Sequence, residues 1–187
     1  MKAMEPKAGL TAVSAHCSFT DTRYTDGSTK TNQQRTMAIV RTSPTSGYYV
    51  DIYRSSHPLS NEYVYHNIGQ QLELKDSKRN PITLKPSQFP VSQKPFDPPG
   101  FSAITNIQSS GETSQDVAAL FTIEEKNRPN KYMQVLFPGE INRSFYTGIA
   151  PASKTAEPIF RTTKTPTIIV RQKGEAVSKP FIAIYEP

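Results

Sequence analysis

The sequence contains little of what disulfide-rich, zinc-binding or membrane-spanning proteins depend on. Among its 187 residues there is one cysteine, Cys17, and no tryptophan. A single cysteine excludes an internal disulfide framework and a zinc cluster held by several thiolates. No stretch approaches the roughly 20 consecutive apolar residues that a membrane-spanning helix needs. The lysines of residues 1–10 are not followed by an apolar run, so the sequence also predicts no signal peptide.

Catalytic and cofactor motifs are missing as well. There is no glycine-rich phosphate loop and no nucleophile elbow. The histidines, His16, His57 and His66, do not have the one-turn spacing of a metal-binding helix. His16 adjoins Cys17, but neighbouring residues of a strand point to opposite faces, so the two would not share a metal ion. We therefore expect neither a metal site nor a cofactor.

Proline, in contrast, is abundant, with 16 residues. This number argues against long helices, because an interior proline removes a hydrogen bond and clashes with the preceding turn. Several prolines fall between residues 76 and 100, and we expect this stretch to be an extended surface connection that makes a contact or covers a sheet edge. A second proline-rich interruption is expected between Pro138 and Pro166, and it carries Tyr146 and Phe160.

Where the sequence is periodic, the period is two residues, which is typical of β-strands. The clearest hairpin joins residues 35–42 to 48–54 through the turn-forming segment 43–47. Further strands are expected at 62–67 with a short partner at 71–75, at 101–107 before a turn at 109–111, at 117–124 and 131–137 around a turn at 127–130, and at 165–171 paired with 181–186 around residues 173–174. This spacing predicts one all-β module over residues 1–187, an antiparallel β-sandwich of about nine or ten strands with little or no helix.

The charge balance favours an anionic partner. Lys+Arg number 22 and Asp+Glu 16, so the formal net charge is +6 and the pI is about 9.4. Nucleic acid, anionic lipid and acidic polysaccharide all fit this sign of charge. Basic residues alternate with acidic ones and no nucleic-acid-binding motif is present, so we expect no nucleic-acid partner. We expect no membrane partner either.

The predicted hairpin region is rich in tyrosine and arginine. Tyrosine rings offer flat apolar faces to sugar rings, and arginine binds carboxylates in a bidentate manner. These residue types predict a carbohydrate-binding set of Arg41, Tyr49, Tyr53, Arg54, His57, Tyr63 and Tyr65. Tyrosine is also a common strand residue, so an ordinary sheet surface accounts for the same pattern.

A base for β-elimination on a uronic acid could come from the same region. This chemistry needs a proton acceptor and a group that neutralises the carboxylate. Tyr65 and His66 are the candidates, although adjacent residues of a regular strand cannot face one site together. The alternative is that His66 bonds a backbone group while Tyr63 and Tyr65 cover the sheet.

Several of these segments resemble the heparinase II/III-like polysaccharide lyases, which include alginate lyases. The resembling stretches are Arg35–Val40, Gly47–Arg54 and Tyr63–Asn67 near the start, and Thr167–Gly174 and Pro180–Pro187 at the end. The resemblance implies the C-terminal β-sandwich region of such an enzyme, whose catalytic tyrosine lies in an α/α-toroid domain. His66 matches the histidine of a strand motif that we do not assign as the catalytic base. The chain contains neither a toroid nor the histidine-rich segment that precedes the sheet in that family.

Three hypotheses follow. The first is a noncatalytic module that binds or positions an acidic, uronate-containing polysaccharide such as alginate or a glycosaminoglycan, alongside the toroid domain of its parent enzyme. The second is a lyase that acts by itself with a Tyr/His base. The third is a structural module that braces the toroid. The resemblance implies a secreted or periplasmic bacterial enzyme.

Overall fold

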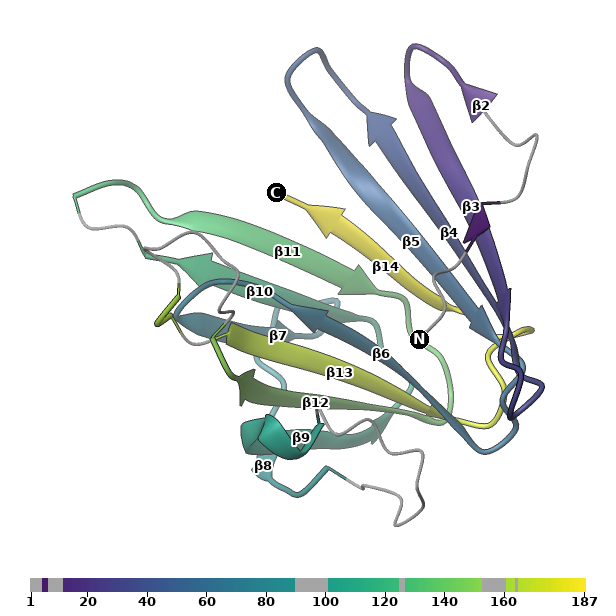
Figure 1. Ribbon diagram of the computed structural model, residues 1–187. Helices are drawn as coiled ribbons and strands as arrows, with labels where there is room; N and C mark the ends of the chain where they lie inside the picture. Colours follow the sequence, from purple (N-terminus) through teal and green to yellow (C-terminus); the bar gives the residue numbers. More distant parts are fainter. Residues whose placement is uncertain (1–4, 7–11, 90–100, 125–126, 153–160, 164) are drawn as a thin grey trace.

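Two antiparallel β-sheets form the molecule (Figure 1). The computed structural model describes residues 5–6, 12–89, 101–124, 127–152, 161–163 and 165–187. None of the helical segments in this part of the chain is long and apolar enough to cross a bilayer. The elements are β1 (Glu5–Pro6), β2 (Ala12–Val13), β3 (Cys17–Thr25), β4 (Asn32–Arg41), β5 (Gly47–Ser55), β6 (Ser60–His66), β7 (Gln71–Lys75), β8 (Lys85–Pro86), the 3₁₀ turn η1 (Phe101–Ala103), β9 (Thr105–Thr113), β10 (Val117–Ile123), β11 (Lys131–Phe137), β12 (Arg143–Ala150), β13 (Thr165–Lys173) and β14 (Phe181–Glu186).

The larger sheet has nine strands in the order β1-β3-β4-β5-β14-β11-β10-β7, with β2 added beside β3. The smaller has five, in the order β6-β13-β12-β9-β8. Each strand turns alternate side chains towards the other sheet, and most of these inward side chains are apolar where the two sheets face each other. The predicted all-β antiparallel sandwich with little helix is therefore confirmed.

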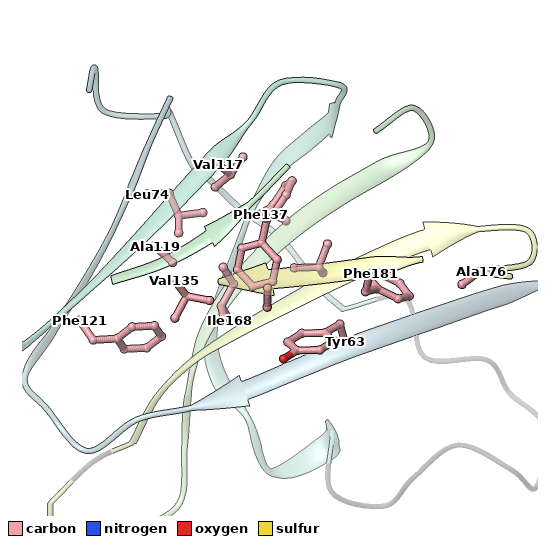
Figure 2. Close-up of a cluster of buried hydrophobic side chains, with 13 residues drawn as sticks. Tyr63, Leu74, Val117, Ala119, Phe121, Val135, Phe137, Ile168, Ala176 and Phe181 are labelled. Atoms are coloured by element: carbon pink, nitrogen blue, oxygen red, sulfur yellow. The ribbon is translucent and has the colours of Figure 1, made fainter. Parts of the chain in front are cut away.

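The core between the sheets comes from the middle of the larger sheet and from the smaller one. Phe121, Val135 and Phe181 of the larger sheet meet Phe145 and Ile168 of the smaller sheet, and all five are at most 1% exposed. Figure 2 shows several of these side chains pointing into the same layer. No residue of β3 or β4 belongs to this cluster. Figure 1 accordingly shows β3, β4 and part of β5 extending away from the smaller sheet.

The two predicted hairpins with the clearest turns are confirmed. In the first, β4 pairs with β5 from Gln33↔Ser55 to Arg41↔Gly47, and the turn between them is closed by the Thr42 N–H donating to the Ser46 carbonyl at 3.0 Å. In the second, β10 pairs with β11 from Val117↔Phe137 onward.

Two other predicted pairings are wrong. β6 pairs with β13 in the smaller sheet, whereas β7 pairs with β10 in the larger one. Similarly, β13 lies between β6 and β12, whereas β14 lies between β5 and β11. In both cases the chain crosses from one sheet to the other, because a sandwich joins consecutive strands across its layers as well as within them.

Two long strands lie where no strand was predicted, which raises the number above nine or ten. β3 consists mostly of polar residues, so its sequence shows little alternation between apolar and polar positions. β12 lies within the proline-flanked stretch that was predicted to be an interruption, and its Phe145 is 1% exposed in the core. Phe160 of the same stretch lies outside the described residues.

Strand β9 also differs from the prediction. It begins after a 3₁₀ turn at Phe101–Ala103 and then continues through the predicted turn at residues 109–111. Gly111 has φ +71°, which glycine adopts without a steric cost. The pairing of β9 with β12 shifts register twice beside this segment, as at a β-bulge.

The proline-rich connection does more than run over the surface. Within its described part, β8 pairs with β9 and so covers an edge of the smaller sheet, as expected. Phe89 is only 6% exposed and packs against Phe101 and Tyr146 on the outer face of that sheet. Residues 90–100 of the connection lie outside the described residues.

Candidate functional site

Strand pairing places the predicted carbohydrate-binding residues on different surfaces. Asp51 of β5 is 1% exposed and lies on the inner face, so the residues two positions away on either side share that face. Tyr49 and Tyr53 are therefore inward-facing, and Arg54 is on the outer face. His57 lies in the β5–β6 connection, where its Nδ1 is 3.1 Å from the Ser60 carbonyl oxygen.

Tyr53, Tyr63 and Tyr65 are part of the core region. Tyr63 is 4% exposed, and its ring packs edge-on against Phe137. Tyr53 stacks on Phe181 with ring centroids 6.1 Å apart, and Tyr65 packs against the core cluster. The ring of Tyr63 is consequently not available as a platform for a sugar at the surface.

The hydroxyl of Tyr63 belongs to a buried polar network. It donates to Oδ2 of Asp51 at 2.6 Å and lies 2.5 Å from the Tyr185 hydroxyl. Arg35 binds the same carboxylate, with Nε 2.9 Å from Oδ1 and Nη2 on Oδ2. Burial raises the pKa of Tyr63 above its usual range, and Tyr185 and Asp51 act in the same direction. The network therefore holds a neutral tyrosine next to a carboxylate whose charge is balanced by the Arg35 guanidinium.

Tyr65 and His66 do not converge on one site. Tyr65 faces the core, where its ring lies edge-on to Phe121 at 5.3 Å, and burial raises its pKa. His66 points to the opposite face of β6, with Nδ1 2.7 Å from the Thr167 hydroxyl oxygen, and burial lowers its pKa. A tyrosine that acts as a base needs a lowered pKa, so the environment of Tyr65 works against that role.

The most distinctive open surface is the inner face of the strands that extend beyond the smaller sheet. We call it the wing face and define it by Arg35, Met37, Ile39 and Arg41 of β4 and Tyr49 of β5. Met37 is 43% exposed, Ile39 52% and Tyr49 43%, although all three lie on the core side of the sheet. Ile39 pairs directly with Tyr49, and a hollow of about 310 Å³ lies over these residues.

The wing face combines an apolar strip with positive charge. Along β4 the inward positions read Arg35, Met37, Ile39 and Arg41, so two arginines bracket the apolar pair. The bracketing residues are six positions apart, which is about 20 Å along a strand. Asp51 neutralises Arg35, whose pKa is raised by the hydrogen bond to that carboxylate. Arg41 is exposed and lies at the other end of the strip.

Of these residues, the carbohydrate prediction included Arg41 and Tyr49 and missed the remaining members of the wing face. The signal for them was present in the sequence, since the alternation of residues 35–41 already places Arg35, Met37, Ile39 and Arg41 on one side of a strand. What was missing was the knowledge that this side is left open.

A second hollow, of about 520 Å³, lies near the ends of β7, β9 and β12. Its polar lining includes the amides of Gln70, Asn106 and Gln108, and it has no charged residue among those lining it. In the part of the chain that the structure describes, no group of three or more His, Cys, Asp or Glu side chains could hold a metal ion. Unlike this second hollow, the wing face places an exposed tyrosine and an exposed arginine side by side, a combination that suits an anionic, ring-containing ligand.

No protein-family profile matches the chain. A curated relative does match: an endo-acting ulvan lyase of Formosa agariphila is 32% identical over 190 residues, which cover 99% of this chain and 23% of the relative. The chain thus spans about a quarter of the length of the curated relative it matches. It is a distant homologue of one segment of a polysaccharide lyase.

Proposed function

We propose that this chain is a noncatalytic module of a heparinase II/III-like polysaccharide lyase and that it binds an acidic polysaccharide across the wing face. The observation that carries the proposal is the bracketed strip, in which the exposed Tyr49 and Ile39 lie next to the exposed Arg41. The homology to a segment of an ulvan lyase supports a polysaccharide as the ligand.

Each part of the strip has a physical role in this proposal. The flat ring of Tyr49 stacks on a sugar ring, and Ile39 and Met37 extend the apolar contact. Arg41 donates two hydrogen bonds to a carboxylate or sulfate of the polymer. Asp51 holds Arg35 and reduces its net charge, so Arg41 is the main anion-binding group.

The noncatalytic role is supported by the environments of Tyr65 and His66, which lie on opposite faces of β6. Catalysis and the remaining substrate contacts would come from the rest of the parent enzyme, for which the resemblance suggests an α/α-toroid domain. Ulvan, alginate and glycosaminoglycans are the candidate ligands. Because these are large polymers, we expect the enzyme to act outside the cytoplasm, either in the periplasm or after secretion.

Affinity electrophoresis tests the proposal. The 187-residue chain is run through gels that contain ulvan, alginate, heparin or a neutral glucan. We expect retardation in at least one acidic gel and none in the neutral one. Arg41→Ala and Tyr49→Ala should each weaken binding about tenfold, which corresponds to about 1.4 kcal/mol.

Matched controls lie on the larger sheet but outside the wing face. Arg54→Ala removes an arginine from the outer face of β5, and Tyr132→Ala removes a tyrosine that is 53% exposed on β11. Both should leave the retardation unchanged. Free migration in every acidic gel would refute the binding role, as would equal losses for Arg41→Ala and Arg54→Ala. A rise in ultraviolet absorbance when the chain alone is mixed with a uronate polymer would refute the noncatalytic role.

A further inference from the structure

The outer face of the larger sheet carries a continuous apolar row. The paired positions run across six adjacent strands, because each residue is the direct cross-strand partner of the next. Adjacent strands are about 4.8 Å apart, so the row is about 24 Å long. Its members are Ala118 of β10, Leu136 of β11, Ile184 of β14, Val50 of β5, Ala38 of β4 and Phe19 of β3.

This row is unusual for a solvated sheet face. Antiparallel sheets with one face in water place polar residues on that face. β14 instead reads Phe181-Ile182-Ala183-Ile184-Tyr185, with apolar side chains on both sides. Ile182 pairs with Ile52 next to the row and widens it. Strands that are apolar on both faces are typical of sheets covered on both sides, and contiguous apolar patches mark interaction surfaces.

The other sheet shows how this chain covers an outer face when it does so itself. Phe89 and Phe101, from the proline-rich connection and η1, lie over Tyr146 and Ile169 on the outer face of the smaller sheet. Among the described residues, no corresponding cluster covers the row on the larger sheet. Within the part of the chain that the structure describes, the outer face of the smaller sheet is thus covered by aromatic residues and the row on the larger sheet is not.

One end of the row opens into a hollow of about 400 Å³. Ala118, Leu136 and Ile184 contribute to its lining, and Asp76, Arg79 and Asp116 contribute charges of both signs. A hollow lined by apolar and charged residues suits a partner that inserts an apolar side chain and surrounds that side chain with polar groups.

We infer that the apolar row is the docking surface for a second folded domain of the same polypeptide. The relative aligns with 99% of this chain along only 23% of its own length, which places a homologous segment inside a much longer chain. The partner domain presents a complementary apolar surface to the row and inserts a side chain into the hollow. This inference is independent of polysaccharide binding, because the row and the wing face lie on opposite sides of the larger sheet.

The test compares cysteine labelling in two proteins. One is the 187-residue chain, and the other is the complete polypeptide encoded by the gene that contains this chain. Cys17 is exposed, so it is first replaced by serine. Val50→Cys and Leu136→Cys place probes in the row, and Leu59→Cys is the control in the β5–β6 connection, where Leu59 is 76% exposed. Maleimide labelling of each probe is followed by mass spectrometry.

We expect both row probes to label about tenfold more slowly, or slower still, in the complete polypeptide than in the isolated chain, because protection follows the population of open states. The Leu59→Cys probe should label at similar rates in both. Equal rates at the row probes would overturn the inference, and so would a coding sequence that encodes no further domain. Row protection that increases with the concentration of the isolated chain would assign the surface to a second copy instead. None of these outcomes depends on retardation in polysaccharide gels.

Discussion

Replacing Tyr63 with phenylalanine tests whether the buried polar network stabilises the sandwich. The change removes one hydroxyl and keeps the ring that packs against Phe137 and Phe181. The lost hydrogen bond, 2.6 Å from oxygen to oxygen, has the ionised Asp51 as its acceptor. Hydrogen bonds to charged groups contribute about 1.5–3 kcal/mol.

The structure favours the lower half of that range. Asp51 keeps its bonds to Arg35, so the carboxylate remains compensated after the substitution. The Tyr185 hydroxyl loses its contact with Tyr63 but lies in a partly exposed side chain. We therefore expect Tyr63→Phe to reduce the free energy of unfolding by about 2 kcal/mol. For a chain of this length, this corresponds to a fall in Tm of about 4–8 °C.

Urea unfolding followed by far-ultraviolet circular dichroism measures the effect, since the chain has no tryptophan for fluorescence. The slope of the free energy against urea should stay constant while the midpoint falls. Tyr132→Phe is the matched control, because Tyr132 is 53% exposed, and it should change stability by less than about 0.5 kcal/mol. If Tyr63→Phe behaves like this control, the network does not contribute to stability and the reasoning is refuted.

Three further predictions concern a closely packed glycine, the second tyrosine of the same network and a buried arginine. Gly139→Ala should destabilise the protein, because an added Cβ would lie 2.2 Å from the Ser114 carbonyl oxygen, whereas Gly27→Ala, with nothing within 4 Å, should have little effect on the urea midpoint. Burial raises the pKa of Tyr185 to about 12. The stability that comes from this raised pKa is therefore complete below pH 10 and is lost as the pH rises towards 12. Tyr185→Phe should flatten the fall in Tm across that interval, and an unchanged fall would contradict this prediction. Arg143 is 2% exposed, and its guanidinium donates hydrogen bonds to Gln172 and to the carbonyls of Pro138, Lys179 and Pro180. A lysine cannot reproduce these bonds, so Arg143→Lys should lower the free energy of unfolding in urea by about 2 kcal/mol. A loss of less than about 0.5 kcal/mol would contradict this prediction.

The sequence determined the local structure of this protein to a large extent. Alternation with a period of two predicted the β4–β5 and β10–β11 hairpins and the all-β class, because both depend on residues that are close in the chain. The same alternation grouped Arg35, Met37, Ile39 and Arg41 on one side of a strand. Local signals were weakest where strands are polar or interrupted by glycine and proline, and there β3 and β12 were missed.

Only the tertiary structure decided which side of each strand is covered. Period two separates two faces but does not say which one meets the other sheet, so Tyr63 and Tyr49, both inward-facing, differ in exposure from 4% to 43%. The difference arises because the smaller sheet ends before it reaches the wing face. Which sheet a strand joins also depends on long-range pairing, as for β6 and β7, and the six-strand apolar row exists only once distant strands are in register. The sequence thus determined which residues share a face, and the packing of the two sheets decided which faces remain open for a ligand or another domain.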